Sequence, residues 1–254
     1  MSLRVGQRVI LRDMDFSLAP GQFVAVLGPN GVGKTTLLRA IAGLHTADDG
    51  QLHFRDRATT DLSPAERAKQ IAFMQSEEII TETMTVREVV AAGRYPYHRW
   101  FEWHENPHDQ EIIAMALLAV RMESFASRPF ATLSSGERQR IWLALGLAQE
   151  ASLLLLDEPT SHLDLRAAHE ILHLLREQSR AGKTVVSVLH DVNEAAEFAD
   201  TIMLLGDERL LILDRPEAVL TSGQLDRAYG TPMELMRSPS GALRAFPSFR
   251  PNFD

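Results

Sequence analysis

The segment 28–35, Gly-Pro-Asn-Gly-Val-Gly-Lys-Thr, constrains the fold of this 254-residue chain more than any other feature of the sequence. It follows Phe23–Leu27, an apolar run that predicts a strand buried on both faces. It precedes residues 33–42, which favour a helix ending before Gly43. A loop of the form G-x-x-x-x-G-K-[ST] between a strand and a helix predicts a phosphate-binding loop, and an unliganded glycine turn is the less favoured alternative.

The residue types in this loop indicate how it would hold a nucleotide. Glycines let successive backbone N–H groups turn toward phosphate oxygens, and the start of the following helix adds a positive dipole end. Lys34 would reach the β- and γ-phosphates, and the Thr35 hydroxyl would be a ligand of Mg²⁺. ATP and Mg²⁺ are therefore the expected cofactors. The expected ATP-binding residues of this segment are Gly28, Pro29, Asn30, Gly31, Val32, Gly33, Lys34, Thr35 and Thr36.

Short apolar runs alternate with helical patterns along the chain, which predicts an α/β fold with a largely parallel sheet. Further buried strands are expected at Ile71–Met74, Leu153–Leu156 and 184–189, and a helix is expected at Leu165–Arg180. The C-terminal tail adds one more expected strand, at 210–213, and otherwise carries little functional signal.

The middle of the chain, residues 82–147, has mostly helical patterns and no convincing strand. We therefore predict a P-loop NTPase fold of the RecA-like type, forming a single domain over 1–254. Its parallel-sheet core comprises 1–81 and 148–254, and 82–147 is inserted as a helical subdomain.

The composition narrows the classes of function. With 34 acidic and 26 basic residues the formal net charge is −8, which argues against nucleic acid as the main partner because phosphate backbones select basic surfaces. The sequence has no cysteine, which excludes disulfides and thiolate metal sites. The N-terminus lacks the apolar stretch of a signal peptide, and the most apolar windows are too short to span a bilayer. Any membrane role is therefore expected to come through a partner.

Two acidic residues, Asp157 and Glu158, follow the expected strand Leu153–Leu156 at the sheet edge where parallel α/β proteins bind ligands. Asp157 could hold magnesium, and Glu158 could orient or deprotonate an attacking water. His190 ends the strand 184–189 and would point to the same crevice, toward the γ-phosphate or its water. On position alone, a solvated loop for the acids and a structural role for the histidine remain alternatives.

The segment 133–140, Leu-Ser-Ser-Gly-Glu-Arg-Gln-Arg, opens a helical pattern that continues to Leu147. Small residues at a helix start can form a second anion site, or an ordinary cap with nothing bound. The order of the motifs over residues 10–200 resembles the ATP-binding subunit of ABC (ATP-binding cassette) transporters. These motifs are the phosphate-binding loop, Gln75 after a strand, the LSSGE segment, Asp157-Glu158, Ser-His-Leu-Asp at 161–164, and His190.

The resemblance implies roles for several residues. Gln75 would contact magnesium and the attacking water, and would report the state of a membrane partner. Ser134 and Gly136 would bind the γ-phosphate of ATP held by a second copy, and Asp164 would lie at the junction of the two copies. The expected catalytic residues are Glu158, His190 and Gln75. The expected magnesium ligands are Thr35, Gln75 and Asp157.

The chain departs from the family pattern at two places. LSGGQ reads LSSGE here, with Ser135 for a glycine and Glu137 for the glutamine. Serine is small enough for close approach, whereas a carboxylate near a phosphate requires the Glu137 side chain to face away. The aromatic residue that stacks on adenine in the family falls at Arg4 or Val5, where only the guanidinium could cover the base.

Within the family, the chain resembles importer ATPases for iron chelates such as siderophore complexes, haem and cobalamin, in its length, its loop and Gly-Arg-Tyr-Pro-Tyr at 93–97. The implied partners are a second copy with two ATP at the interface, a polytopic membrane permease and, indirectly, a substrate-binding protein, but no nucleic acid. The implied location is peripheral, at the cytoplasmic face of the inner (cell) membrane. An aromatic cluster would face the permease or form a local core: Tyr95, Tyr97, Trp100, Phe101 and Trp103.

The main alternative is a soluble ABC-type ATPase in repair, translation or cofactor assembly. Repair and translation ATPases of this kind usually carry coiled coils, zinc modules or two cassettes, none of which is visible here. A small-molecule kinase would need neither LSSGE nor the segment 161–164. The cargo itself cannot be read from the chain, because the ATPase does not contact the cargo in this family.

Overall fold

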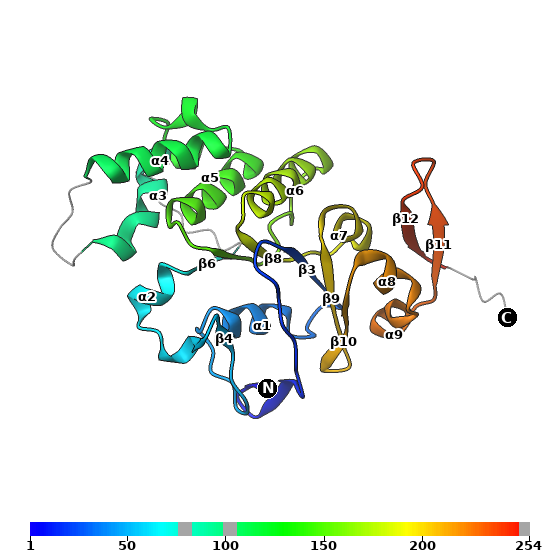
Figure 1. Cartoon of the computed structure of the whole chain (residues 1–254). Helices are drawn as coiled ribbons and strands as arrows, with labels where there is room; N and C mark the ends of the chain where they lie inside the picture. The colour runs from blue at the N-terminus through cyan, green and yellow to red at the C-terminus, as the bar shows by residue number, and fades with distance from the viewer. Residues whose placement is uncertain (76–82, 99–105, 249–254) are drawn as a thin grey trace.

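The computed structural model describes residues 1–75, 83–98 and 106–248 (Figure 1). At its centre is a six-stranded sheet in which five neighbouring strands run parallel and β10 pairs antiparallel with β9. In spatial order the strands are β10 (Arg209–Asp214), β9 (Thr201–Gly206), β3 (Phe23–Leu27), β8 (Thr184–Val188), β7 (Leu153–Leu156) and β6 (Ile71–Met74).

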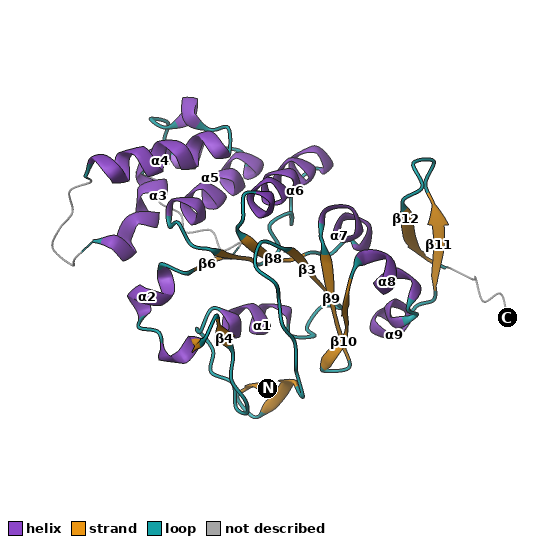
Figure 2. Cartoon of the chain, in the orientation of Figure 1, coloured by secondary structure: helices purple, strands orange, loops and turns teal. Residues whose placement is uncertain are grey.

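Both faces of the sheet are covered, which explains why its strands are continuous apolar runs. All five residues of β3 are fully buried, and they alternate between two cores. Val24 and Val26 pack with Leu37 and Leu38 of α1 on one face. The other three β3 residues face the core beneath α5, α6 and α7, and Figure 2 shows these helices on the side of the sheet opposite α1.

The remaining elements surround this sheet. The helices are α1 (Lys34–Ile41), α2 (Pro64–Ala68), α3 (Val86–Ala91), α4 (Pro107–Ala119), α5 (Ser135–Ala148), α6 (Leu165–Arg180), α7 (Val192–Phe198), α8 (Pro216–Thr221) and α9 (Gln224–Tyr229). Short 3₁₀ turns are η1 (Thr59–Asp61), η2 (Ala92–Tyr97), η3 (Glu123–Phe125) and η4 (Phe130–Thr132). Three hairpins complete the fold: β1 (Leu3–Val5) with β2 (Arg8–Leu11), β4 (His53–Phe54) with β5 (Arg57–Ala58), and β11 (Met233–Arg237) with β12 (Leu243–Pro247).

Helices α3, α4 and α5 pack together at one end of the molecule, where the sequence predicted a helical insertion (Figure 2). Each begins with a capping box, in which the first side chain and an acidic residue three positions later satisfy each other's backbone N–H groups. Arg94 of η2 ties this group together from a buried position. Its guanidinium donates to Asp109 at 2.8 Å and to the Ala148 carbonyl at 2.7 Å. The exact domain division at 82 and 147 stays a prediction.

The expected strands at 71–74, 153–156 and within 184–189 are confirmed, as is the helix Leu165–Arg180. The sequence analysis did not predict β9, the N-terminal hairpin or β11 with β12. No helix within residues 1–75, 83–98 and 106–248 is both long and apolar enough to cross a membrane.

Candidate ATP-binding site

The loop between β3 and α1 has a backbone that requires glycine at two positions. Gly28 has φ 148° and Gly33 has φ 109°, both in the region that side chains disfavour. A Cβ on Gly28 would lie 2.6 Å from the Leu205 carbonyl oxygen, and one on Gly33 would lie 2.5 Å from Ile10 Cγ2. Gly33 also caps α1, so the loop turns directly into the positive end of that helix.

Lys34 closes over its own loop. Its ammonium Nζ donates to the carbonyl oxygens of Gly28 at 2.8 Å and Pro29 at 3.1 Å, and the residue is only 6% exposed. Burial lowers the pKa of Lys34, and the nearby carboxylates of Glu158 and Asp157 partly offset this effect. An anion bound in the loop would supply the compensating charge that this buried ammonium lacks.

Asp157 lies directly after β7, and its N–H donates to the carbonyl of Met74 at the end of the adjacent strand β6. Burial raises the pKa of Asp157, while a hydrogen bond from the Thr35 side chain acts in the opposite direction. The structure thus brings together the two expected oxygen ligands, from α1 and from the end of β7. A hydroxyl and a carboxylate are donors that Mg²⁺ prefers, so these residues fit the ion.

Glu158 is held by hydrogen bonds to both carboxylate oxygens. His190 Nε2 lies 2.9 Å from Oε1, and Ser161 Oγ donates to Oε2 at 3.1 Å. The backbone of Glu158 has φ 53°, a conformation that non-glycine residues rarely adopt. Burial raises the pKa of Glu158, but the hydrogen bonds from His190 and Ser161 and the charge of Lys34 outweigh it, so the net shift is downward.

Lys34, Thr35, Glu158, Ser161 and His190 face one cavity of 560 Å³, whereas Asp157 is not among its lining residues. The cavity is lined by Ile10, Asn30, Gly31, Gly33, Lys34, Thr35, Thr36, Glu158, Ser161, His162 and His190. Half of the expected site residues, from the segments 30–36, 158 and 190, therefore line one cavity although these segments lie far apart in the sequence. The sequence analysis placed Arg4 or Val5 where the base would bind, but neither is among the lining residues, whereas Ile10 of β2 is. Its close contact with Gly33 could not be read from a motif.

Tyr229 is a second residue that the sequence analysis missed. It comes from α9, in the tail that was expected to carry little functional signal, yet it forms a hydrogen bond with the backbone of Gly28. Burial raises the pKa of Tyr229, and this hydrogen bond only partly offsets the shift. The tail thus supports the first glycine of the loop from outside.

Gln75 follows β6 and is held away from the cavity. Its amide oxygen accepts hydrogen bonds from Arg39 Nη2 and Nε, at 3.0 and 3.2 Å in the amide orientation that satisfies both groups. It is not among the lining residues, so its expected contact with magnesium stays a prediction.

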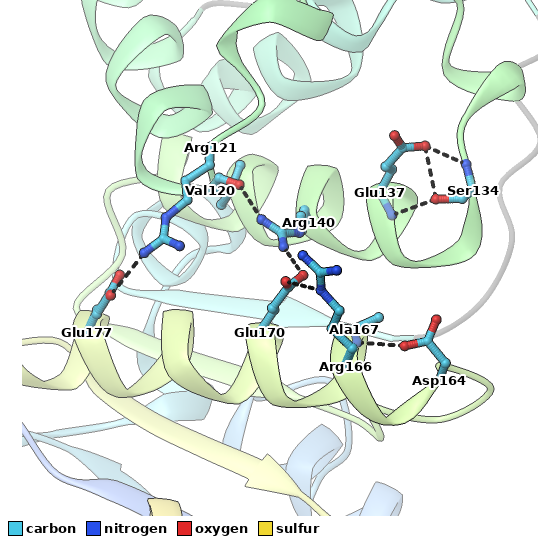
Figure 3. A network of polar contacts seen from close by, with 10 residues as sticks. All are labelled: Val120, Arg121, Ser134, Glu137, Arg140, Asp164, Arg166, Ala167, Glu170 and Glu177. Carbon is cyan, nitrogen blue, oxygen red and sulfur yellow. Dashed lines mark hydrogen bonds and ion pairs between the residues drawn. The ribbon is translucent and has the colours of Figure 1, made fainter.

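The LSSGE segment folds back on itself (Figure 3). Ser134 caps α5 by accepting from the Glu137 N–H at 3.3 Å. The Glu137 carboxylate in return accepts from the Ser134 N–H at 2.8 Å and from its hydroxyl at 2.9 Å. These hydrogen bonds from Ser134 lower the pKa of Glu137. The departure from glutamine is thus a capping box whose carboxylate is engaged with the serine hydroxyl.

Ser134, Gly136 and Asp164, the residues expected to act at the contact with a second copy, also lie outside the cavity. Asp164 caps α6 by accepting from the Ala167 N–H at 2.8 Å (Figure 3). Of the aromatic cluster, Tyr95 is 55% exposed and Tyr97 is 38% exposed, with its hydroxyl donating to the Gln149 carbonyl. Trp100, Phe101 and Trp103 lie outside the described residues.

Comparison with known proteins accounts for this arrangement. The sequence profile of the family described as "ABC transporter" matches residues 11–161. The chain belongs to the ABC transporter family. It is 40% identical over 241 residues to the hemin import ATP-binding protein HmuV of Nocardia farcinica, covering 94% of this chain and 83% of that protein. It is 33% identical to the ferric enterobactin transport ATP-binding protein FepC of Escherichia coli, covering 94% and 88%.

Solved structures agree with the fold of this ABC ATPase. An ABC transporter of the metal-chelate type, in an inward-facing conformation, superposes with a TM-score of 0.83 at 28% identity, over 94% of this chain and 91% of that one. A dimeric ATP-binding cassette in a post-hydrolysis state with ADP and Pi gives a TM-score of 0.70 at 27% identity, over 85% and 95%. ABC ATPases couple ATP hydrolysis to transport, and the predicted core fold is that of the family, while the roles of the individual site residues stay predictions.

Proposed function

We propose that this chain is the ATP-hydrolysing subunit of an importer for an iron chelate or haem, with cobalamin as a third candidate cargo. One observation carries the choice of cargo class. Over nearly its whole length the chain is 33–40% identical to ATP-binding proteins that import hemin, iron(3+)-hydroxamate or ferric enterobactin. The ATPase supplies the energy, and a permease and its binding protein select the cargo.

The first half of the reaction site is built within one chain. The P-loop amides and Lys34 bind the β- and γ-phosphates, because the lysine can exchange its two carbonyl contacts for phosphate oxygens. Thr35 and Asp157 would hold Mg²⁺, which would neutralise charge that develops on the phosphates. Gln75 would join these ligands only after it leaves Arg39.

Hydrolysis uses a water aligned by Glu158. The water oxygen attacks the γ-phosphorus, the bond to the β–γ bridging oxygen breaks, ADP leaves, and the water's proton passes to Glu158. Because its pKa is lowered, Glu158 accepts a hydrogen bond from the water first and takes up the proton only late in the reaction. This suits phosphoryl transfer, because its transition state is loose and mainly needs an oriented nucleophile. His190 and Ser161 fix the direction of the carboxylate.

The second half of the site comes from another copy of the chain. Ser134 and Gly136 lie outside the cavity of their own chain, so they reach a γ-phosphate only across a dimer interface. A homodimer then encloses two ATP, with Asp164 at the junction. A polytopic permease docks on this dimer from the membrane side, which places the subunit at the cytoplasmic face of the cell membrane.

Deletion of the gene, combined with transport measurements, tests this function. Cells that lack the chain are assayed for uptake of radiolabelled ferric siderophore, haem and cobalamin, and the defect is complemented with the wild type or with Glu158→Gln. We expect uptake of one cargo to be lost and to return only with the wild type. The matched permease should copurify from detergent-solubilised membranes, and in proteoliposomes it should stimulate ATP hydrolysis when its binding protein is loaded.

Unchanged uptake of all three cargoes, together with a purely soluble partner, would contradict the importer assignment. The ATPase chemistry of the family would stand, and the soluble alternatives in repair, translation or cofactor assembly would then account for it.

A further inference from the structure

The first turns of α5 and α6 pack directly against each other (Figure 3). A Cβ placed on Gly136 would lie 3.1 Å from the Cβ of Ala167, so a side chain at Gly136 would require the two helices to shift by a few tenths of an ångström. Ala167 is the residue whose N–H donates to Asp164. The turn that presents Ser134 and the turn that presents Asp164 therefore meet at this one contact.

An ion pair makes the next contact along the same two helices. Arg140 of α5 donates through Nη2 to Oε2 of Glu170 on α6, and through Nη1 to the carbonyl of Val120 at 3.2 Å. Oε1 of Glu170 accepts from Arg166 Nε at 3.1 Å. Both oxygens of Glu170 are thus engaged, and the Arg140 side chain is only 16% exposed.

A third contact shows how different this pair is from an ordinary surface pair. Arg121, which follows α4, also pairs with Glu177 of α6, but the two groups are 3.5 Å apart and their side chains are 69% and 52% exposed. Water screens such a pair, and it contributes little. A cavity of 170 Å³ lies between the two pairs, lined by Arg121, Arg140, Glu170, His173, Leu174 and Glu177.

We propose that Arg140 and Glu170 are positioning residues that hold the Ser134 turn on the Asp164 turn, so that both enter the dimer interface as one unit. This inference rests on the proposed function, in which Ser134 reaches ATP in a second copy. Helix α5 belongs to the helical part of the chain and α6 follows β7 of the sheet, so the ion pair crosses between the two parts. A small displacement of α5 would leave Ser134 out of reach while Asp164 stays in place.

Glu170→Gln tests this role because it preserves shape and removes the charge on the α6 side. Binding of a fluorescent ATP analogue to the separate chain should be unchanged. In the Glu158→Gln background, the ATP concentration for half-maximal dimerisation should rise about fivefold, the size of a typical coupling within one ion-pair network. With Glu158 intact, the half-saturating ATP concentration for hydrolysis should rise while kcat at saturating ATP stays within about twofold.

Two matched controls come from the same junction. Glu177→Gln removes the exposed pair, and Arg166→Gln removes the partner that Glu170 has within α6; both should leave dimerisation within about twofold of the parent.

The outcomes separate this inference from the proposed function. If the Glu158→Gln parent does not dimerise with ATP at all, both fail. If the parent dimerises but Glu170→Gln has no larger effect than Glu177→Gln, only the positioning role is overturned. It is also overturned if analogue binding falls in parallel with dimerisation.

Discussion

The P-loop half and the LSSGE half of this ATPase are organised by different parts of the structure. The P-loop half is assembled by the sheet: β3, β7 and β8 end at one edge, and side chains from Lys34 to His190 meet in one cavity. The LSSGE half is a single helix start whose exposed serine is engaged by Glu137 of its own turn. The first half is thus largely preorganised, whereas the second must exchange partners before it can act.

The largest effect is expected at Glu158, which belongs to the P-loop half of the site. Glu158→Gln keeps the shape and one oxygen but loses the charge that aligns water, so kcat should fall by about 10²–10⁴, the range for a positioned base. ATP-bound dimers should accumulate, as measured by size-exclusion chromatography with ATP. Single-turnover hydrolysis gives the rate, and turnover at the wild-type rate would remove Glu158 from its role.

Loss of the buried Lys34 ammonium should remove most of the ATP binding by the P-loop half. Lys34→Ala removes two carbonyl contacts and the charge that faces the phosphates, so ATP affinity should fall at least about 100-fold, as expected for losing a charge-assisted contact to phosphate. Equilibrium binding of a fluorescent ATP analogue measures the effect.

Lys183 provides a control for this change, because its half-buried ammonium also donates to a backbone carbonyl, that of Ala151, at 2.8 Å. Lys183→Ala should cost stability but leave ATP affinity unchanged. Equal losses of affinity in the two variants would show that the Lys34 effect is one of folding.

Removal of the hydrogen bond from His190 tests how much hydrolysis depends on the fixed direction of the Glu158 carboxylate. His190→Ala removes the bond at 2.9 Å but leaves the one from Ser161, so the carboxylate loses one of its restraints. We expect kcat to fall about tenfold, the value of one hydrogen bond to a charged group, with ATP affinity nearly unchanged. Steady-state ATPase assays separate the two, and His173→Ala, on α6, is the matched control. A change in affinity alone would contradict the orienting role.

The same comparison explains what the sequence could and could not predict. The P-loop, Asp157, Glu158 and His190 were predictable because a short pattern sits at the end of a continuous apolar strand in each case. Ile10 and Tyr229 were not, because they approach the loop through packing of β2 and α9 against it, and no local pattern encodes such an approach. Strand β9 was not predicted although its sequence is an apolar run. It ends in a turn at 207–208, and no motif follows that would have marked it as a strand of the site.

The direction of the Glu137 side chain, by contrast, follows from a local rule that was available in the sequence. Serine followed three residues later by glutamate at a helix start is a capping box, and the structure forms it. The sequence analysis expected this carboxylate to face away from a bound phosphate. In this conformation the carboxylate is instead hydrogen-bonded to Ser134, and a phosphate must displace it.

The smallest predicted effect follows from that exchange. Glu137→Gln can keep the cap, because an amide oxygen also accepts from Ser134, but it removes the negative charge that opposes an incoming γ-phosphate. In the Glu158→Gln background, the ATP concentration for half-maximal dimerisation should therefore fall about threefold, in keeping with one partly exposed charge. Thr85 and Glu88 form the matched control, since they cap α3 with the same three contacts at 2.7, 2.8 and 3.3 Å. Glu88→Gln should leave dimerisation unchanged, because Glu88 faces no phosphate. If Glu137→Gln instead raises the ATP concentration for half-maximal dimerisation, the charge assists dimer formation. The two halves of the site would then differ in exposure but not in how far they are preorganised for ATP.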